Sequence, residues 1–554
     1  MKNIFKFTPP NPTNVFKIKR PKLQREDLFD KSANITKSLE DNLKRMQYFL
    51  HYPDNSDVKI RTFDTRIDNE NYPSALIFYD GLVDSDLINN YILRQLMKNT
   101  ENTSGSDLKE CILDNVLAQN QVETEEVFDK TIDKTLIGNC VLFIDTLDVA
   151  FICDTKKLPV RSISKSENEM STRGPCESFV ESLRQNTGLV RKYVKDENLI
   201  FEDIPIGRNA QTACSIAYIS NIANDSIVGE VKRRISSIDV DYILDVGQLE
   251  QLIEDKTYMT SPLILSTERP DKVAEHLFEG RVAILLAGSP NALIVPAVLV
   301  DFMHTAEDAY TRFPYSILLR FFRFPAALIS VLLPGIYIAI VTFHQEMLPT
   351  DLLFSIAATR EKVPFPLLVE LLIMEMAFEI IREASLRTPT PMGPTLGIVG
   401  TLILGQAIVS ANVVSPILVI IVALTGISSF AVANFSLNLT FRILRFVYIF
   451  LGAIAGFFGI SIGLLVHACV LSTATSFGVP YLSPYMPLSS SFFSTDLSNV
   501  PIWKQEERPT FLKPKKRKKT AENFKKVGNK SSSVVAEHSV LHTLYKIILK
   551  IFSK

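Results

Sequence analysis

The sequence predicts a mixed α/β N-terminal domain of two lobes, followed by an α-helical transmembrane bundle of four or five spans and a basic tail. Its 554 residues exceed one ordinary domain. Charged and apolar residues intermingle up to about residue 323, as in soluble proteins, whereas Leu, Ile, Val, Ala, Gly and Phe dominate residues 324–476. Residues 503–530 carry 11 Lys or Arg against 3 Glu, which predicts a tail that is attracted to anionic lipid.

Composition also suggests the domain boundaries. Four prolines among scattered lysines predict a flexible basic leader at residues 1–26. No apolar core of a secretory signal follows the leader, so we expect the N-terminal domain to stay in the cytosol. The remaining expected segments are lobe 1 at 27–160, lobe 2 at 161–310, the transmembrane domain at 311–476 and a partly disordered cytosolic tail at 477–554.

Both lobes alternate helical and strand-like stretches. Apolar residues spaced by three and four predict helices, and short β-branched runs predict strands. In the apolar stretch 281–300, turn residues at 288–291 argue against a membrane span and favour two short strands at 282–286 and 292–300. The other expected elements are helices at 38–48, 84–97, 173–189, 225–235, 247–255 and 272–279, and strands at 58–63, 75–79, 135–146, 149–153, 201–203 and 213–218.

Four apolar runs approach the length that crosses a bilayer, about 20 residues. They are expected at 324–343, 394–411, 416–433 and 446–473. A fifth helix, 367–384, is apolar but carries a stripe of Glu375, Glu379, Arg382 and Glu383 within an arc of about 100°. It lies flat on the membrane in a four-span arrangement and crosses in a five-span one. Four spans place the basic tail in the cytosol with the N-terminal domain.

The sequence offers little for catalysis. It holds no phosphate-binding loop, no HExxH and no GxSxG, and only seven histidines. The six cysteines show no CxxC spacing and are expected to be reduced structural thiols. We therefore expect a protein that is not an enzyme, with no cofactor, no metal site and no nucleic-acid partner.

Two membrane helices carry the candidate functional residues. In the run 394–411, Gly397, Thr401 and Gly405 form a ladder of small residues that lets helices pack closely. Gln406 and Ser410 share one face of that helix and need a polar neighbour or water. They either make interhelical hydrogen bonds or line a pore. The candidate pore-lining set is Ile403, Gln406, Val409 and Ser410.

The acidic helix allows two interpretations as well. Its carboxylates either sit in water at the membrane surface, or surround an axis in an oligomer. In the second case Glu375, Glu379 and Glu383 would form rings that attract cations.

Several long strings resemble one known family. These are RGPCESFVESLRQNTGLVRKYVKD at 173–196, EGRVAILLAGSPNALIVP at 279–296, LLPGIYIAIVTFHQEMLPTDLLFSIAATREKVPFP at 332–366 and ELLIMEMAFEIIREASLRTPTPMGPTLGIVGTLILGQAIVSANVVSP at 370–416. In this order they resemble the GerA family of spore germination receptor A subunits, over roughly residues 30–505. The chain departs from the family pattern at Ser410, where Glu or Gln is common.

The resemblance implies a function. Such subunits are expected in the inner membrane of bacterial spores, together with a transporter-like B subunit and a lipoprotein C subunit. The A subunit is expected to assemble as a homo-oligomer, a pentamer, into a nutrient-gated cation channel that starts germination. The alternative is a non-conducting membrane scaffold that assembles the receptor and couples nutrient sensing by the B subunit to ion release elsewhere. A secondary transporter ranks lower, because no internal repeat of the transporter type is visible.

Overall fold

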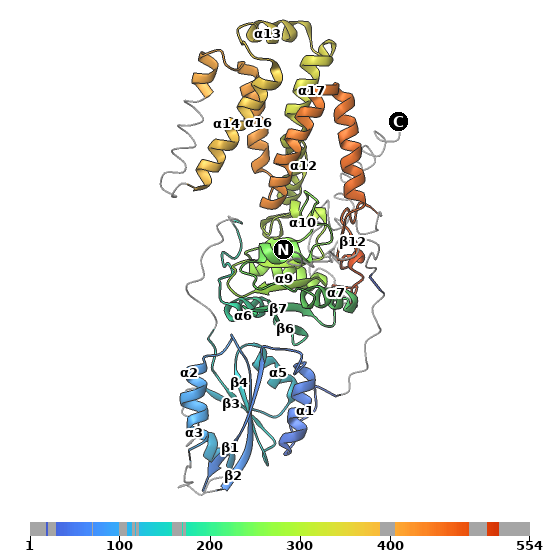
Figure 1. Cartoon of the computed structure of the whole chain (residues 1–554). Helices are drawn as coiled ribbons and strands as arrows, with labels where there is room; N and C mark the ends of the chain where they lie inside the picture. The colour runs from blue at the N-terminus through green and yellow to red at the C-terminus, as the bar shows by residue number, and fades with distance from the viewer. Residues whose placement is uncertain are drawn as a thin grey trace, which may run out of the picture.

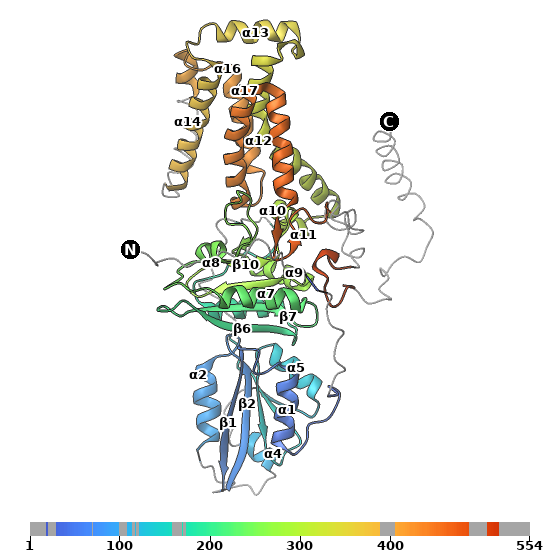
Figure 2. The same ribbon diagram turned by 45° about the vertical axis from the view of Figure 1, so that its right-hand side comes forward.

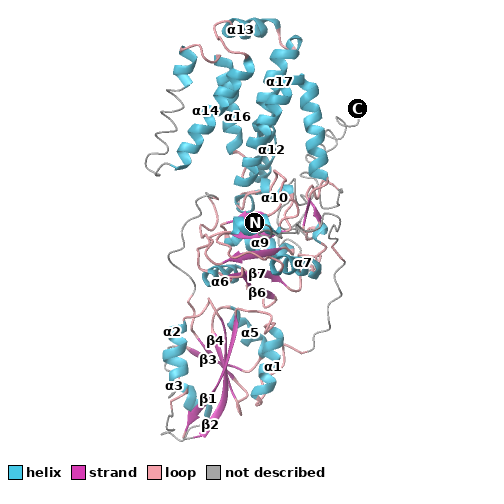
Figure 3. Ribbon diagram, in the orientation of Figure 1, coloured by secondary structure: helices cyan, strands magenta, loops and turns pink. Residues whose placement is uncertain are grey.

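The computed structural model describes residues 18–19, 29–68, 70–98, 108–113, 117, 121–157, 169, 173–387, 405–486 and 507–519. These residues form an elongated molecule with lobe 1 at one end, lobe 2 in the middle and a bundle of helices at the other end (Figure 1). Strands are confined to the two lobes and to a small hairpin beside lobe 2, while the far half is helical (Figure 3). The predicted fold class, an α/β domain before a helical region, is confirmed at this level.

Lobe 1 is a five-stranded antiparallel sheet of order β1-β2-β4-β5-β3 with helices on both faces. Alternate strand residues feed two separate cores, one under α1 and α5 and the other under the continuous helix α2-η1-α3. The elements are α1 Leu39–Phe49, β1 Val58–Ile67, β2 Glu70–Tyr79, α2 Ser85–Leu87, η1 Ile88–Leu93, α3 Arg94–Leu96, α4 Leu108–Cys111, β3 Val122–Glu125, α5 Phe128–Leu136, β4 Cys140–Ile144 and β5 Ala150–Cys153.

Lobe 2 repeats the same architecture, with sheet order β6-β7-β9-β10-β8. In both lobes a helix precedes a long hairpin, a capped helix follows it, and the third strand lies at the far edge. The elements are α6 Leu183–Tyr193, β6 Leu199–Ile206, β7 Thr212–Ile219, α7 Asp225–Ser236, α8 Val246–Ile253, β8 Leu265–Thr267, α9 Pro270–Glu279, β9 Val282–Leu286, β10 Ala292–Val295, α10 Leu299–Met303 and α11 Glu307–Tyr310. The lobes are therefore two copies of one topology.

Most predicted lobe elements are present, but the helix expected at 173–189 starts only at Leu183, the strand expected at 292–300 ends at Val295, and a third element is wrong at its start. The turn at 288–291 does join two buried strands, β9 and β10, with Gly288 at φ +87°. The strand expected at 135–146 is wrong at its start, because α5 runs to Leu136 and ends at Gly138, whose φ is +100°. Only Cys140–Ile144 is strand.

The two lobes are joined by a buried polar contact. Arg191 of α6 donates to Asp57 at 2.7 Å and to the carbonyl of Leu199 at 2.9 Å, and its guanidinium lies 4.1 Å from the ring centre of Tyr79. Burial raises the pKa of the Asp57 carboxyl, while the charge of Arg191 opposes that shift. Because both charged groups are enclosed, the pair fixes how the lobes meet.

Among the described residues, the helical part contains three long helices and several shorter ones. Helix α12 leaves lobe 2 and crosses the bundle, α13 lies across the far end, and α14 and α16 stand beside α12 (Figures 1 and 2). The bounds are α12 Phe313–Phe343, η3 Gln345–Met347, α13 Thr350–Arg360, α14 Leu367–Arg387, α16 Pro416–Phe430 and α17 Phe435–Ser472, followed by β11 Thr475–Ser476, β12 Val479–Pro480 and η6 Thr510–Leu512. A further helical turn covers 405–410.

Helix α17 folds back on itself. Gly456 has φ +60° and ψ -142°, which no α-helix contains. A Cβ built on Gly459 would lie 2.3 Å from the Leu451 carbonyl, and one on Gly463 would lie 2.6 Å from the Leu451 side chain. Residues eight and twelve apart cannot touch along a straight helix. The segment is therefore an antiparallel helical hairpin that turns at Gly456.

The expected number of spans is wrong for the described residues. There, two helices are long and apolar enough to cross a membrane, Tyr315–Phe343 and Phe435–Ser472, and the second of these is the hairpin. The run predicted at 416–433 forms only the 15-residue α16, which starts at Pro416 as predicted but ends at Phe430, where the chain turns. The predicted span 394–411 lies mostly outside the described residues.

The inter-lobe contact leads to a prediction. Gly188 of α6 packs so closely on lobe 1 that an added Cβ would lie 2.7 Å from the Gly81 carbonyl. Gly188→Ala should push the lobes apart and lower the thermal midpoint of the soluble domain by several degrees, because two rigid backbones must separate. Gly229→Ala is the matched control, since an added Cβ there meets nothing within 4 Å. Equal midpoints in the two variants would contradict this account of the contact.

Candidate functional site

Helix α14 holds its acidic residues against arginines of α17. Glu375 is fully buried and accepts from Arg445 at 2.8 Å, and Arg445, also buried, donates to the Ser330 carbonyl of α12 at 2.9 Å. Spacings of four residues on α14 and three on the antiparallel α17 place the next pair, Glu379 and Arg442, one turn lower. Two rungs therefore tie three helices together.

The lower end of α14 continues this ladder. Arg382 lies 3.9 Å from Glu379, donates to the Ser429 hydroxyl of α16 at 2.7 Å, and lies between the rings of Phe378 and Phe430. An arginine held by a carboxylate, a hydroxyl and two aromatic faces is well compensated away from water. The structure buries Arg445 inside the bundle and leaves the Arg442 side chain 19% exposed.

The residues predicted to attract cations are Glu375, Glu379 and Glu383 of α14. The carboxylates of Glu375 and Glu379 are matched by arginines within the same chain. Glu383 lies one further turn along α14. Glu375 and Glu379 thus face the other helices, whereas Glu383 is exposed. The role of the three glutamates in ion attraction stays a prediction.

The predicted pore-lining residues lie elsewhere. Gln406 and Ser410 are exposed and Val409 is half-buried in the helical turn 405–410, which ends where Asn412 takes φ +53°. A Cβ built on Gly405 would meet nothing within 4 Å. The side chains of Gln406 and Ser410 are thus not covered by the described residues. Ile403, Gly397 and Thr401 lie outside the described residues, so the pore-lining and packing roles stay predictions.

A second set of charges fixes the bundle to lobe 2. Asp308 of α11, only 1% exposed, receives Arg323 of α12 at 2.6 and 2.9 Å and Arg320 at 3.3 Å. Burial by itself would raise the pKa of the Asp308 carboxyl, but hydrogen bonds from Arg323 and the charges of both arginines outweigh burial and lower it. Beside them, burial and the charge of Arg320 lower the pKa of His304 to about 3, so His304 is neutral.

The end of the α17 hairpin also enters lobe 2. Ser476 donates to the Leu263 carbonyl at 2.7 Å, and the Phe477 amide donates to Asp255 at 2.6 Å. The ring of Phe477 is buried under the guanidinium of Arg234, 4.1 Å away. Movement of the hairpin would therefore be passed directly to the lobe 2 sheet.

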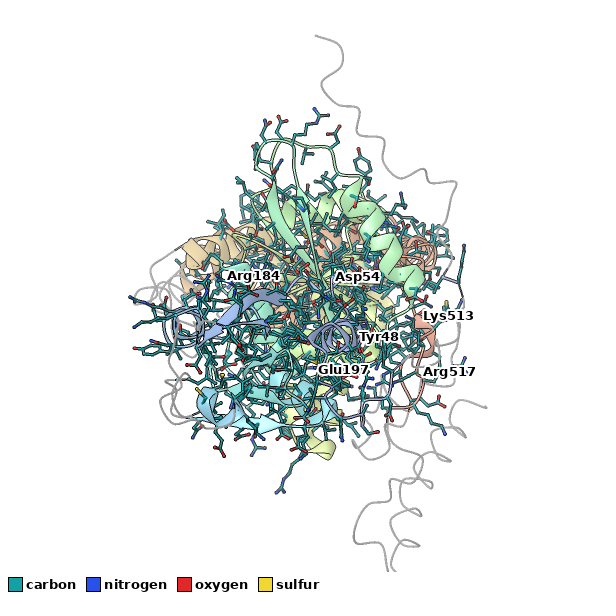
Figure 4. All side chains as sticks on the ribbon, turned by 90° about the horizontal axis from the view of Figure 1, so that it is seen from below. Tyr48, Asp54, Arg184, Glu197, Lys513 and Arg517 are labelled. Carbon is teal, nitrogen blue, oxygen red and sulfur yellow. The ribbon has the colours of Figure 1, made fainter. Side chains whose placement is uncertain are left out.

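Part of the basic tail is an ordered strap on lobe 2. Leu512 is fully buried in the lobe 2 core, and the Lys515 ammonium binds the Ser220 carbonyl at 2.8 Å and Asp225 at 2.5 Å. Asn224 caps α7 and donates to the carbonyls of Lys19 and Lys513, so these two distant segments meet here. Viewed from the lobe 1 end, Lys513 and Arg517 lie together at one edge (Figure 4).

Residues 507–519 of the expected basic tail are thus ordered on lobe 2, and the attraction of the tail to anionic lipid stays a prediction. This position places the strap at the lobe 2 end of the bundle. Both the start of α12 and the strap therefore contact lobe 2.

The chain resembles known proteins over most of its length. The family model for the Bacillus/Clostridium GerA spore germination protein matches residues 45–511. The chain is 42% identical over 455 residues to spore germination protein KA of Bacillus subtilis (strain 168), covering 82% of this chain and 83% of that protein. It is 37% identical over 490 residues to the uncharacterized membrane protein YfkQ of the same organism, covering 87% and 94%.

A solved structure is also similar. The N-terminal domain of the A subunit of the Bacillus megaterium spore germinant receptor GerK3 is 31% identical and aligns with 49% of this chain and 99% of that chain, at a TM-score of 0.39. The family match spans both lobes, the helices and the start of the strap, and it agrees with the resemblance seen in the sequence. The chain belongs to the GerA family of spore germination proteins.

The ion-pair ladder predicts a large coupling energy between Glu375 and Arg445. Glu375→Gln leaves Arg445 buried without its charge partner, which should destabilise the bundle by about 3–5 kcal/mol, whereas Glu375→Leu with Arg445→Met should recover most of that loss. Thermal or denaturant unfolding of the purified full-length protein measures both. The exposed pair Arg208 and Asp239 supplies the control, and Arg208→Gln should leave the midpoint unchanged. A double variant no more stable than Glu375→Gln would contradict the pairing.

The Asp308 contact predicts a pH dependence. Because its folded pKa lies below the ordinary value, its stabilisation is present above about pH 4 and is lost as pH falls through the folded pKa. The variant Asp308→Asn lacks this stabilisation by the carboxylate charge at every pH. The difference in unfolding midpoint between wild type and Asp308→Asn should be largest at pH 7 and shrink below pH 4. A difference that stays constant down to pH 3 would show that the charge is not responsible.

Proposed function

We propose that this chain is the A subunit of a nutrient germinant receptor, and that copies of it form a closed ring, a pentamer, that conducts cations when germination starts. Family membership supports the receptor role. One structural observation supports conduction. Gln406 and Ser410 are exposed on the turn 405–410, while Glu375 and Glu379 of α14 are paired with arginines. Among the described residues, Gln406 and Ser410 are thus polar groups that a neighbouring copy or a lumen would meet.

The assembly follows from the same geometry. A lumen along the subunit axis needs a ring that closes, which requires a fixed angle between copies. The rigid lobe pair and its buried junctions can hold such an angle. We further propose that a transporter-like B subunit and a lipoprotein C subunit complete the receptor, and that the chain has no enzymatic activity of its own.

We place the protein in the spore inner membrane, with both lobes and the strap on the cytosolic side. Arg320 and Arg323 at the start of α12, together with the exposed Lys516, Arg517 and Lys518 of the strap, gather positive charge at the lobe 2 end. An excess of Lys and Arg beside membrane helices favours the cytosolic side. The similarity to a named membrane protein and the two apolar helices support a membrane location.

The conducting role predicts altered ion release. Spores carrying Val409→Ala or Ser410→Ala should release potassium without nutrient, or at a changed rate, at normal protein abundance, because side-chain volume and polarity at a constriction set the barrier. Potassium efflux and an immunoblot measure this. Ile427→Ala is the control, since Ile427 is exposed, as Ser410 is, but lies on α16.

The outcomes separate the two candidate functions. Changed efflux confined to the 405–410 turn supports a path through this subunit. If efflux is unchanged wherever the protein is present, and is lost only where the protein disappears, the chain is a scaffold and the conducting element belongs to a partner.

A further inference from the structure

The far end of the bundle holds buried polar atoms that no protein group satisfies. Among the described residues, Oε2 of Glu370 and Nε of Arg360 are enclosed without a hydrogen-bond partner, and the hydroxyls of Tyr337 and Ser415 are enclosed beside each other. Their side chains come from four places, namely α14, α12, the cap of α16 and the end of α13. Such groups are rare in folded proteins and mark sites that take a ligand or water.

The atoms converge on one carboxylate. The other oxygen of Glu370, Oε1, accepts from the Ser415 amide at 2.5 Å, which anchors the carboxylate at the start of α16. Its free oxygen faces Nε of Arg360 at 3.9 Å, too far for a hydrogen bond. The Tyr337 side chain neighbours Glu370, Arg360 and Ser415. Glu370, Ser415 and Tyr337 are 0%, 1% and 7% exposed, and apolar side chains surround them.

We propose that Glu370, Tyr337 and Ser415 form a monovalent-cation site at the far end of the helical bundle, and that the guanidinium of Arg360 occupies it here as a tethered cation. The three oxygens are hard ligands of the kind that alkali cations accept. Only one of them carries a formal charge, which suits a monovalent ion better than Ca²⁺ or Mg²⁺, whose sites gather more carboxylates.

The Arg360 side chain is held loosely enough for a cation to displace it. Its side chain is 30% exposed, and it contacts Glu370 loosely instead of through a two-pronged hydrogen bond. It ends α13, which lies across the far end and whose other faces are largely exposed. A cation that enters from this side competes with Arg360 for the same carboxylate. The site is therefore filled either by the arginine or by the ion.

The inference deepens the proposed function, because it places a cation-recognition site on the side of the bundle opposite the lobes. Its test measures binding and not conduction. Failure of the test therefore leaves the proposed channel intact, and a failure of the Val409 and Ser410 variants to alter efflux leaves this site intact.

The first experiment uses full-length protein purified in mild detergent. Thermal unfolding is followed by circular dichroism in potassium chloride and in N-methylglucamine chloride at equal ionic strength. Arg360→Gln should gain a potassium-specific rise in midpoint of about 2–4 °C, because an ion that binds only the folded state stabilises it. Wild type and Lys362→Gln, which removes an exposed charge two residues away, should show no such rise.

The double variant Arg360→Gln with Glu370→Gln should lose the potassium-specific rise. A missing rise in Arg360→Gln, or a rise that persists without the carboxylate, would overturn the proposal. If Arg360→Gln does not fold, the proposal is tested on the wild-type protein by chemical modification of Arg360. Potassium should then speed modification of Arg360 by phenylglyoxal severalfold, read by mass spectrometry, while the exposed Arg208 reacts at a constant rate. Equal Arg360 reactivity in both salts would refute displacement of the arginine.

Discussion

The helical half of this protein depends on one constraint, namely that a charge enclosed between helices must meet its opposite inside the same chain. Arg445 is 1% exposed and Glu375 is fully buried, and each would be costly alone. Their pairing brings α14 against α17 and α12. The Glu379 and Arg442 pair one turn away sets the rotation of both helices. An apolar interface would let such helices slide, whereas two charged rungs allow a single register.

Glycine contacts set how close the helices come. A Cβ on Gly452 would lie 2.5 Å from the Gly335 carbonyl, and one on Gly335 would lie 2.7 Å from the Tyr448 carbonyl. Helix α12 and the first half of α17 therefore touch backbone to backbone. This close approach lets Arg445 reach the Ser330 carbonyl of α12. Small residues and charged rungs thus act together, the first setting the distance and the second the register.

The lobes and the bundle form one mechanical unit because three connections join them. Helix α12 begins at the Asp308 cluster, the α17 hairpin ends in the lobe 2 core at Phe477, and the strap returns to cap α7. Lobe 1 attaches to lobe 2 through Arg191. A displacement of α17 therefore reaches both sheets through buried contacts that resist bending. This arrangement suits a protein whose membrane part must respond to events at its soluble part, or the reverse.

The sequence by itself determined the division into an α/β half and a helical half, the turn between β9 and β10, and the family. Each of these depends on local periodicity, turn residues or long strings that neighbours in the chain encode. Tertiary structure alone decided the rest. The hairpin at Gly456, the doubled topology of the lobes and the docking of Leu512 join residues far apart in sequence. The same holds for the pairing of Glu375 with Arg445. The stripe of acidic residues predicts a polar helix face, but it does not predict which residue that face will contact. Hydropathy counts such residues as charged and solvent-seeking, whereas a charge 70 positions away lets the fold enclose them.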